Sequence, residues 1–388
     1  MEYRINPKNG DKLSILGFGC MRLPQGEKEQ QKLLRLAVEE GINFFDTAYI
    51  YQGSEAALGK ALLGGYRERV KIATKLPPYF VKKYSDFERI FTTQLQRLQT
   101  AHVDYYFMHM INDVGVLNRL LDLGLDQWLE EKRRQGRLIN VGFSYHGGKE
   151  EFIRLVDAYP WQFCMIQYNF MDEHQQAGKS GLEYAAAHGL PVFIMEPLRG
   201  GKLVSSLPKA VYDIWESAPV KRSPAEWALR FVWDHPGVTL ALSGMNSLEM
   251  LRENIAIASH SRANSLSGQE LALFVRVRDI LQQSIAIPCT GCNYCMPCPH
   301  GVDIPTCFTC YNDRAIEGKL GAIAKYLMQT TMKTQSVNAS LCQKCGRCEK
   351  HCPQNIAIGR ELSKAARALE GFYYRPLSFL IKKFMRLQ

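Results

Sequence analysis

Eight of the 12 cysteines in this 388-residue chain lie in two short, regularly spaced runs. The first run is C-T-G-C-N-Y-C-M-P-C-P, over residues 289–299, and the second is C-Q-K-C-G-R-C-E-K-H-C-P, over residues 342–353. In each run, three cysteines at intervals of three residues precede a Cys-Pro pair. Three such thiolates can hold three corners of a [4Fe-4S] cubane, and the cysteine beside proline then ligates the other cluster. The spacing therefore predicts two iron–sulfur clusters.

This rule divides the eight cysteines into two interleaved sets. The first cluster is expected on Cys289, Cys292, Cys295 and Cys352, and the second on Cys298, Cys342, Cys345 and Cys348. Two Zn(Cys)4 sites are the alternative, because paired C-x2-C units with a spacer are enough for zinc. The third cysteine at the same interval and the Cys-Pro pair, both present twice, favour [4Fe-4S]. Cys307 and Cys310 have no second pair, so we expect ordinary helix residues at these positions.

The N-terminal sequence and the thiol content favour a cytoplasmic protein. The first 12 residues contain no apolar signal-peptide segment, and no run of 18 apolar residues occurs anywhere. Ten cysteines lie after residue 288. In a reducing compartment, clustered thiols are more often metal ligands than disulfides.

The formal net charge of +10 is concentrated near the C-terminus. Residues 281–388 contain 14 Lys or Arg against 6 Asp or Glu, whereas residues 1–280 contain 34 against 32. Each oxidised cluster with its four thiolates carries about −2, so two clusters would offset about half of this local excess. Nucleic-acid binding has no further support.

The last 18 residues, 371–388, contain four basic residues and no acid. A helix there would place these apolar residues on one face: Leu377, Leu380, Ile381, Phe384 and Met385. Such a basic amphipathic tail can contact a membrane surface or an acidic partner. Docking on its own domain is the alternative, and we expect no transmembrane segment.

Eight short β-rich runs alternate with amphipathic helical stretches over residues 1–280. The runs are LGFGC (16–20), INFFDTA (42–48), KIATK (71–75), DYYFMH (104–109), INVGFS (139–144), MIQYN (165–169), PVFIME (191–196) and TLALSG (239–244). Ser223 to Glu226 form a capping box with proline at the first helical position, which marks a helix start. A doubly wound sheet usually has about five to seven strands, whereas eight strands with helical connections suit a closed parallel barrel. The pattern predicts an α/β fold, a TIM (β/α)8 barrel.

Polar residues follow three consecutive strands of this barrel. Asp46 ends the second run with Tyr51 five residues on, Lys75 ends the third, and His109 ends the fourth. Taken singly, such residues are more often a helix cap, a solvated side chain or a structural histidine. Together they would meet at the carboxyl ends of the strands, where barrels carry their chemistry. A tyrosine with a pKa of about 10 becomes a better proton donor beside an ammonium that favours the phenolate.

The segments around these residues resemble the aldo-keto reductase family. The similar segments are LGFGCMRLP, FFDTAYIYQGSE, ATK, DYYFMH, MEPLRGGKL and GMNSLEMLRENI, which together span roughly residues 1–280. The resemblance implies NAD(P)H-dependent reduction of an aldehyde or ketone, with Tyr51 as the proton donor. Asp46, Lys75 and His109 complete the implied catalytic set.

The resemblance also implies a nicotinamide nucleotide site. Ser144 and Gln167 would meet the carboxamide, and residues 243–254 would hold the adenosine phosphate, at the N-terminus of a helix. The implied contacts in that segment are Gly244, Asn246, Ser247 and Asn254. Tyr145 and Met195 depart from the family pattern, and so do Gly244 and Met250, which replace basic residues. NADP or NAD is therefore expected, and a pocket that has lost nicotinamide binding is the alternative.

The spacer between the cysteine runs, residues 300–341, has helical periodicity and little β-branching. It resembles the α-helical dicluster domains of fumarate reductase type iron–sulfur subunits. The string CTGCNYCMPCPHGVDIP resembles the aldo-keto reductase subgroup with an appended C-terminal ferredoxin-like 2[4Fe-4S] domain. We expect the barrel over residues 1–284, the mostly α-helical ferredoxin-like domain over 285–370, and the tail over 371–388.

Three functional hypotheses follow from this organisation. The first is an aldo-keto reductase that reduces a small-molecule carbonyl and also carries two clusters. The alternative is an electron-transfer enzyme whose clusters pass electrons from a ferredoxin or flavodoxin to a substrate or cofactor in the barrel. Hydride transfer moves two electrons at once, whereas a cubane transfers one at a time. A flavin usually mediates between the two, so a flavin in the pocket near Met195 is not excluded. The third, an iron–sulfur interaction protein with a vestigial barrel, is disfavoured by the intact catalytic set.

Overall fold

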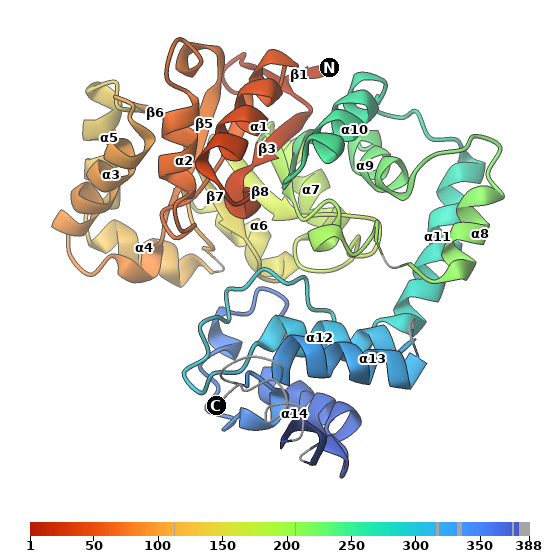
Figure 1. Cartoon of the computed structure of the whole chain (residues 1–388). Helices are drawn as coiled ribbons and strands as arrows, with labels where there is room; N and C mark the ends of the chain where they lie inside the picture. The colour runs from red at the N-terminus through yellow and green to blue at the C-terminus, as the bar shows by residue number, and fades with distance from the viewer. Residues whose placement is uncertain (112, 206, 316–317, 332–335, 375, 380–388) are drawn as a thin grey trace. The chain divides into compact units, whose positions relative to one another are not determined.

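The computed structural model describes residues 1–388 except 112, 206, 316–317, 332–335, 375 and 380–388 (Figure 1). The chain forms two compact units. Unit 1 comprises Met1–Leu198 and Arg222–Ser267, and unit 2 comprises Arg199–Lys221 and Gly268–Gln388. The expected tail positions Leu380, Ile381, Phe384 and Met385 lie outside the described residues. The domain limits expected from the sequence stay a prediction.

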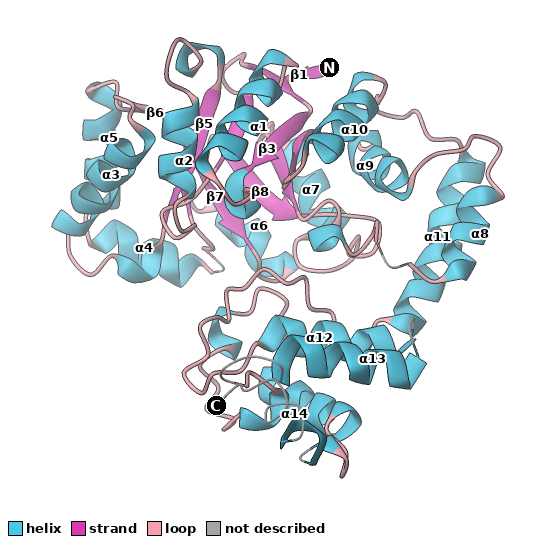
Figure 2. Ribbon diagram, in the orientation of Figure 1, coloured by secondary structure: helices cyan, strands magenta, loops and turns pink. Residues whose placement is uncertain are grey.

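Unit 1 contains a closed barrel of eight parallel strands, drawn in magenta in Figure 2 with helices around them. In barrel order the strands are β3 (Leu16–Gly19), β4 (Phe44–Asp46), β5 (Lys71–Leu76), β6 (Val103–Met108), β7 (Leu138–Tyr145), β8 (Phe163–Gln167), β9 (Val192–Met195) and β10 (Val238–Ser243), and β10 pairs with β3. Each overlaps one of the eight runs named from the sequence. The predicted TIM barrel is confirmed.

The helices of unit 1 connect successive strands on the outside of the barrel (Figure 1). They are α1 (Glu27–Glu39), α2 (Ser54–Ala61), α3 (Ser85–Leu98), α4 (Val114–Asp122), α5 (Leu125–Arg134), α6 (Lys149–Asp157), α7 (Gly178–Ala187), α9 (Pro224–Asp234) and α10 (Leu248–Ser259). The predicted capping box starts α9, where the Ser223 hydroxyl accepts a hydrogen bond from the Glu226 N–H at 3.1 Å. The antiparallel pair β1 (Tyr3–Ile5) and β2 (Lys12–Ser14) precedes the barrel.

Large apolar side chains fill the barrel interior. The buried set is Leu13, Phe44, Ala73, Tyr105, Phe107, Phe163, Met165, Phe193, Leu240 and Leu242. Because side chains of a strand alternate between its two faces, the next inward position after Phe44 is Asp46, and the next after Ala73 is Lys75. The same alternation from Met165 leads to Gln167. The apolar core thus sets which polar side chains face the carboxyl end of the barrel.

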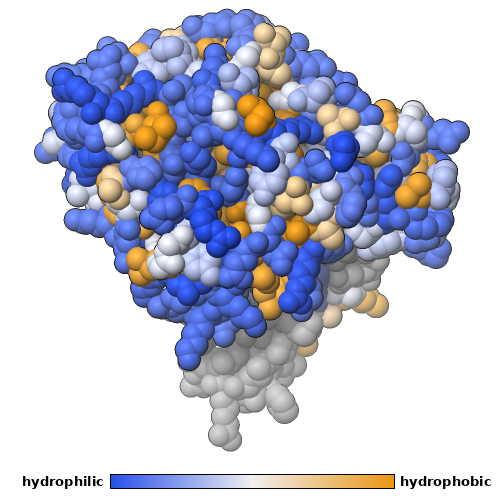
Figure 3. Space-filling view, turned by 90° about the horizontal axis from the view of Figure 1, so that it is seen from above, coloured by the Kyte–Doolittle hydropathy of each residue, from blue (hydrophilic) through white to orange (hydrophobic). Residues whose placement is uncertain are grey.

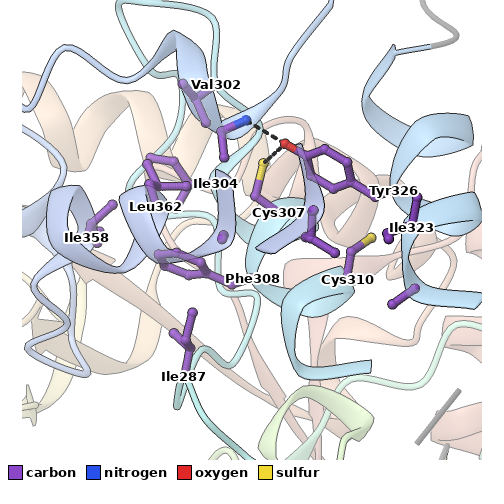
Figure 4. Close-up of a cluster of buried hydrophobic side chains, with 14 of the residues drawn as sticks. Ile287, Val302, Ile304, Cys307, Phe308, Cys310, Ile323, Tyr326, Ile358 and Leu362 are labelled. Carbon is purple, nitrogen blue, oxygen red and sulfur yellow. Dashed lines mark hydrogen bonds between the residues drawn. The ribbon is translucent and has the colours of Figure 1, made fainter. Parts of the chain in front are cut away.

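Unit 2 is helical in its described residues, as expected for the cysteine-rich region. Its helices are α8 (Lys209–Glu216), α11 (Gly268–Ser284), α12 (Ile304–Asn312), α13 (Gly318–Tyr326) and α14 (Ile358–Leu369). Asp303 caps α12 by accepting from the Thr306 N–H at 3.2 Å. A small apolar core joins α12 to α14 through side chains such as Phe308 and Leu362 (Figure 4).

The face in Figure 3 is mostly hydrophilic, with hydrophobic residues scattered singly or in small groups. Within the described part of the chain, no helix has the length and apolar character needed to cross a membrane. The cytoplasmic location expected from the sequence stays a prediction.

Candidate functional site

A buried ion pair lies at the carboxyl ends of β4 and β5. The Lys75 ammonium donates to both carboxylate oxygens of Asp46, each at 2.6 Å, and to the Thr47 carbonyl at 2.7 Å. Lys75 is only 1% exposed. Burial lowers the pKa of Lys75 and raises the pKa of Asp46, and the ion pair opposes both shifts. Three hydrogen bonds therefore hold the ammonium in one place.

Tyr51 lies beside this pair on the loop between β4 and α2. The Lys75 Nζ atom is 4.9 Å from the centroid of the Tyr51 ring. The two ends of the loop are joined by a 2.7 Å hydrogen bond between the hydroxyls of Thr47 and Ser54, and the Ser54 hydroxyl also donates to the Cys20 carbonyl at 2.8 Å. Tyr51 is half-buried. The loop thus keeps the phenol near the ammonium while leaving part of it open to a substrate.

His109 follows β6 and lies close to the tyrosine. Its ring centroid is 6.1 Å from that of Tyr51, with the two rings nearly perpendicular. Burial, assisted by the charge of Lys75, holds the pKa of His109 well below its ordinary value of 6.5. At neutral pH the imidazole is therefore uncharged. The structure brings together all four residues that the sequence proposed as a catalytic set.

Ser144 and Gln167 lie at the carboxyl ends of the neighbouring strands β7 and β8. The Ser144 hydroxyl accepts a hydrogen bond from the Met110 N–H at 2.8 Å. The Gln167 amide donates to the Asp172 carboxylate at 2.7 Å, and its oxygen accepts from the Gln176 amide at 3.1 Å. Gln167 is also the register partner of Met195 on β9. Both residues face the end of the barrel that carries Lys75, and the orientation of Gln167 is held by side chains that follow β8.

The segment after β10 leads directly into α10. Gly244 and Asn246 are exposed, and the Ser247 hydroxyl caps the helix by accepting from the Met250 N–H at 3.2 Å. Asn254 is buried and donates to the Ser243 hydroxyl at 3.0 Å. An exposed loop before a helix of 12 residues offers backbone N–H groups and the positive end of a helix dipole, a combination that binds phosphate groups.

Glu55 and His146 are buried polar residues of this region that the sequence analysis did not single out. Glu55 accepts from the Thr74 hydroxyl at 2.7 Å and pairs with Arg97 at 3.1 Å, so it anchors the start of α2 directly after the Tyr51 loop. Glu55 ends the segment FFDTAYIYQGSE. An acid in the first turn of a helix is favoured by the helix dipole, and this is the sequence signal that could have identified it. His146 lies two residues after Ser144 and is hydrogen-bonded to Gln176 at 3.2 Å.

The burial of His146 predicts a specific loss of stability in acid. Burial lowers its pKa to about 4, whereas an unfolded histidine titrates near its ordinary value of 6.5. Stability from the neutral ring is therefore complete above about pH 6.5 and is lost as the pH falls toward 4. Between pH 7 and pH 5 the expected loss in unfolding free energy from this residue is about 2 kcal/mol. We expect His146→Asn to remove that share of the pH dependence.

Urea unfolding at pH 7 and pH 5, followed by tryptophan fluorescence, measures this effect. All tryptophans except Trp215 lie in unit 1, so the signal reports mainly on the barrel. His188→Asn changes an exposed histidine and is the matched control, which should retain the full pH dependence. An equal acid sensitivity in His146→Asn and the wild type contradicts the prediction.

Two hollows in unit 2 are each lined by four cysteines. One hollow is lined by Cys298, Cys342, Cys345 and Cys348. The second hollow is lined by Cys289, Cys292, Cys295 and Cys352. Each hollow thus combines three cysteines of one run with the proline-adjacent cysteine of the other run. Within the described residues, no three His, Cys, Asp or Glu side chains lie close enough around one point to hold a single metal ion.

The thiols of each hollow influence one another. Burial and the nearby negative charges of Glu349, Cys342 and Cys298 raise the pKa of Cys348 to about 11. Burial and the other three thiols of its hollow likewise raise the pKa of Cys295. A metal group that stabilises thiolates would reverse these shifts, because metal ligands bind in their deprotonated form.

Cys307 and Cys310 lie on α12 and are buried in the core of unit 2, and neither of them lines a hollow. The Cys307 thiol is 3.9 Å from the Tyr326 hydroxyl, which also accepts from the Ala339 N–H at 2.7 Å (Figure 4). The structure thus places both cysteines as core helix residues.

The protein-family comparison matches both parts of the chain. The model described as "Aldo/keto reductase family" matches residues 15–267, which is more than half of the chain. The chain belongs to the aldo/keto reductase family. A second model, "4Fe-4S binding domain", matches residues 336–357, which contain the second cysteine run. The resemblance stated from the sequence is confirmed: the protein is an aldo-keto reductase-like oxidoreductase with a C-terminal 4Fe-4S motif.

Curated relatives and solved structures agree with this family. L-galactose dehydrogenase of Arabidopsis thaliana is 26% identical over 304 residues, covering 70% of this chain and 92% of that protein. "Probable aldo-keto reductase 1" of Glycine max is 33% identical over 138 residues, but the match covers only 30% of this chain and 40% of that protein.

An aldo-keto reductase from Bacillus halodurans in its holo form superposes with a TM-score of 0.60 at 23% identity, covering 71% of this chain and 96% of that one. An aldo/keto reductase from Klebsiella pneumoniae, solved in complex with NADP and acetate, has a TM-score of 0.59 at 24% identity, covering 72% and 96%. These structures share the fold of unit 1.

Proposed function

We propose that unit 1 catalyses the NAD(P)H-dependent reduction of an aldehyde or ketone, with Tyr51 as the proton donor. The observation that carries the proposal is the buried Lys75–Asp46 pair directly beside the half-buried Tyr51 ring. Membership of the aldo/keto reductase family supports the same reaction class.

Each residue of the set has a separate role in this reaction. The Tyr51 hydroxyl gives its proton to the carbonyl oxygen as negative charge develops there. Lys75 stabilises the phenolate that remains, and Asp46 fixes the ammonium through its two 2.6 Å hydrogen bonds. The neutral His109 imidazole donates a hydrogen bond to the same carbonyl oxygen and orients the substrate. The nicotinamide nucleotide, when bound, supplies the hydride.

The residues around the barrel mouth fit such a nucleotide. Ser144 and Gln167 lie at the carboxyl ends of adjacent strands, where polar side chains can meet a carboxamide. The exposed loop 244–247 before α10 can hold a phosphate. Because the Klebsiella pneumoniae relative was solved with NADP, NADPH is the first nucleotide to test.

We also propose that unit 2 binds two [4Fe-4S] clusters, on the two four-cysteine sets that line its hollows. The donor set fits, because four thiolates complete the ligation of one cubane. Bound clusters would supply one-electron transfer. Since eight thiols gathered in this way favour a redox role, the second candidate function is an electron-transfer enzyme that receives electrons from a ferredoxin or flavodoxin.

Anaerobic reconstitution, followed by assays with NADH, NADPH and reduced ferredoxin as electron donors, separates the two functions. We expect NADPH to bind in a fluorescence titration and to be oxidised when simple aldehydes are added. This NADPH-dependent activity should persist after the clusters are removed. Absence of NADPH binding contradicts the first function. Turnover that requires both the clusters and reduced ferredoxin, with no turnover from NADPH or NADH, favours the second.

A further inference from the structure

One surface of unit 2 is strongly basic around the second cysteine run. Exposed basic residues of this run are Lys344, Arg347 and Lys350. Helix α14 adds the exposed residues Arg360, Lys364 and Arg367, whose spacing of four and three places them on one side of the helix. We call these six residues the basic face.

The loop and the helix form one continuous surface. Gly359, at the start of α14, lies against the loop: a Cβ atom there would be in van der Waals contact with the Cα atom of Lys344, at 3.6 Å. The Gly359 N–H also donates to the Glu349 carboxylate at 2.8 Å. The loop that carries Lys344 and Lys350 is therefore joined to the start of α14, the helix that carries the other basic residues.

Few acidic groups offset this charge. Between residues 342 and 369 the acids are Glu349, which is bonded to the start of α14, and Glu361, which is buried between Arg360 at 3.1 Å and Lys364 at 2.9 Å. Residues 342–369 are all described, and none of them is a large exposed apolar side chain. The face therefore lacks the apolar side chains that insert into a lipid surface and the aromatic ones that stack on bases.

The basic face borders the hollow lined by Cys298, Cys342, Cys345 and Cys348. Lys344 and Gly359 line this hollow directly. Cys345 is exposed, whereas the four cysteines of the other hollow are all partly buried. A cluster held by the set that includes Cys345 would lie nearer to solvent, and electron exchange between proteins is fastest over the shortest distance.

We propose that the basic face docks an acidic one-electron carrier protein, which reduces the cluster held by Cys298, Cys342, Cys345 and Cys348. The inference rests on the proposed cluster. In the step, the carrier loses one electron and the cluster core gains it, passing from the 2+ to the 1+ state. No covalent bond forms or breaks, and no proton is transferred. Complementary charge steers such an encounter and raises its rate by about ten- to a thousandfold at low salt.

Charge reversal tests the docking surface. The variant Arg347→Glu/Lys350→Glu/Arg367→Glu changes the face without altering a cysteine. The matched control Lys8→Glu/Lys28→Glu/Lys32→Glu reverses three exposed lysines of unit 1. The probe is reduced flavodoxin, an acidic one-electron carrier, mixed anaerobically with each reconstituted protein in a stopped-flow instrument. Cluster bleaching reports the rate constant as a function of ionic strength.

We expect the triple variant of the basic face to be reduced at least about tenfold more slowly than the wild type at low salt, with the difference disappearing at high salt. The unit 1 control should match the wild type. Iron content, photoreduction by a small deazaflavin and NADPH-dependent activity should be equal in all three proteins, which excludes a folding defect. Equal flavodoxin rates in the wild type and the basic-face variant overturn the docking proposal.

Two further outcomes separate this proposal from those on which it rests. If the variant loses binding to anionic vesicles or to DNA at 150 mM salt, while its flavodoxin rate is unchanged, the face serves a different partner. If the wild type holds no iron after reconstitution, both the cluster proposal and the docking proposal fail. Loss of carbonyl reduction alone affects only the function proposed for unit 1.

Discussion

Replacing Tyr51 with phenylalanine is expected to lower the turnover of NADPH-dependent carbonyl reduction by at least about a hundredfold. The substitution removes only the hydroxyl that would give a proton to the carbonyl oxygen. The ring that contacts Lys75 at 4.9 Å remains, and so do the Thr47–Ser54 hydrogen bond and the Lys75–Asp46 pair. The loss should therefore appear in kcat, with the affinity for NADPH in a fluorescence titration close to that of the wild type.

Tyr49→Phe is the matched control for this experiment. Tyr49 lies in the same loop, but its ring packs against Phe80 and Arg97, at 6.1 Å and 4.7 Å between centres. Tyr49 is half-buried like Tyr51, but in the proposed reaction it gives no proton to the substrate, so removing its hydroxyl should leave kcat within about twofold of the wild type. Near-native reduction by Tyr51→Phe would falsify the assignment of the proton donor.

The second large effect concerns the interleaved ligation of the proposed clusters. Cys352→Ala removes a thiol that belongs to the second run by sequence but lines the hollow of the first run. We expect the iron content after reconstitution to fall from about eight to about four atoms per chain, because a cubane needs all four thiolates for stable binding. Iron analysis and EPR spectra of the reduced protein measure the loss and identify the cluster that remains.

Double variants decide which cysteines share a cluster. If Cys289 and Cys352 hold the same cluster, then Cys289→Ala/Cys352→Ala should still bind about four iron atoms, whereas Cys342→Ala/Cys352→Ala should bind almost none. The reverse result contradicts the interleaved sets. Cys307→Ala is the control, because this buried cysteine lies outside both hollows, and its iron content should stay at about eight. Zinc in place of iron would contradict the cluster proposal as a whole.

The barrel could be predicted because its signals are local. Each strand is a short apolar run between helical stretches, and the inward alternation continues from Phe44 to Asp46 and from Ala73 to Lys75. A polar residue two positions after a core residue therefore marks the site in the sequence itself. The division of the eight cysteines could likewise be proposed from spacing, because each set of three closely spaced thiols is a local feature.

The supporting contacts could not be predicted, because the conformation of an irregular loop does not follow from a local pattern of residue types. The sequence does not indicate that Asp172 and Gln176 hold the amide of Gln167, or that Gln176 also contacts His146. These bonds depend on how the loop after β8 folds back over the strand ends. Burial then lowers the pKa of His146, a shift that follows from the environment of the ring and not from its neighbours in sequence.

By itself, the sequence determined the family, the eight-stranded barrel and the residue types of both candidate sites, because alternation and ligand spacing are encoded over a few residues. Only the tertiary structure assigned Arg199–Lys221 to unit 2, where α8 packs against α11 with the rings of Trp215 and Phe274 5.2 Å apart. It also decided that the second cysteine run adjoins the basic side of α14. Both outcomes depend on which apolar faces pack together, and that depends on shape complementarity between segments far apart along the chain.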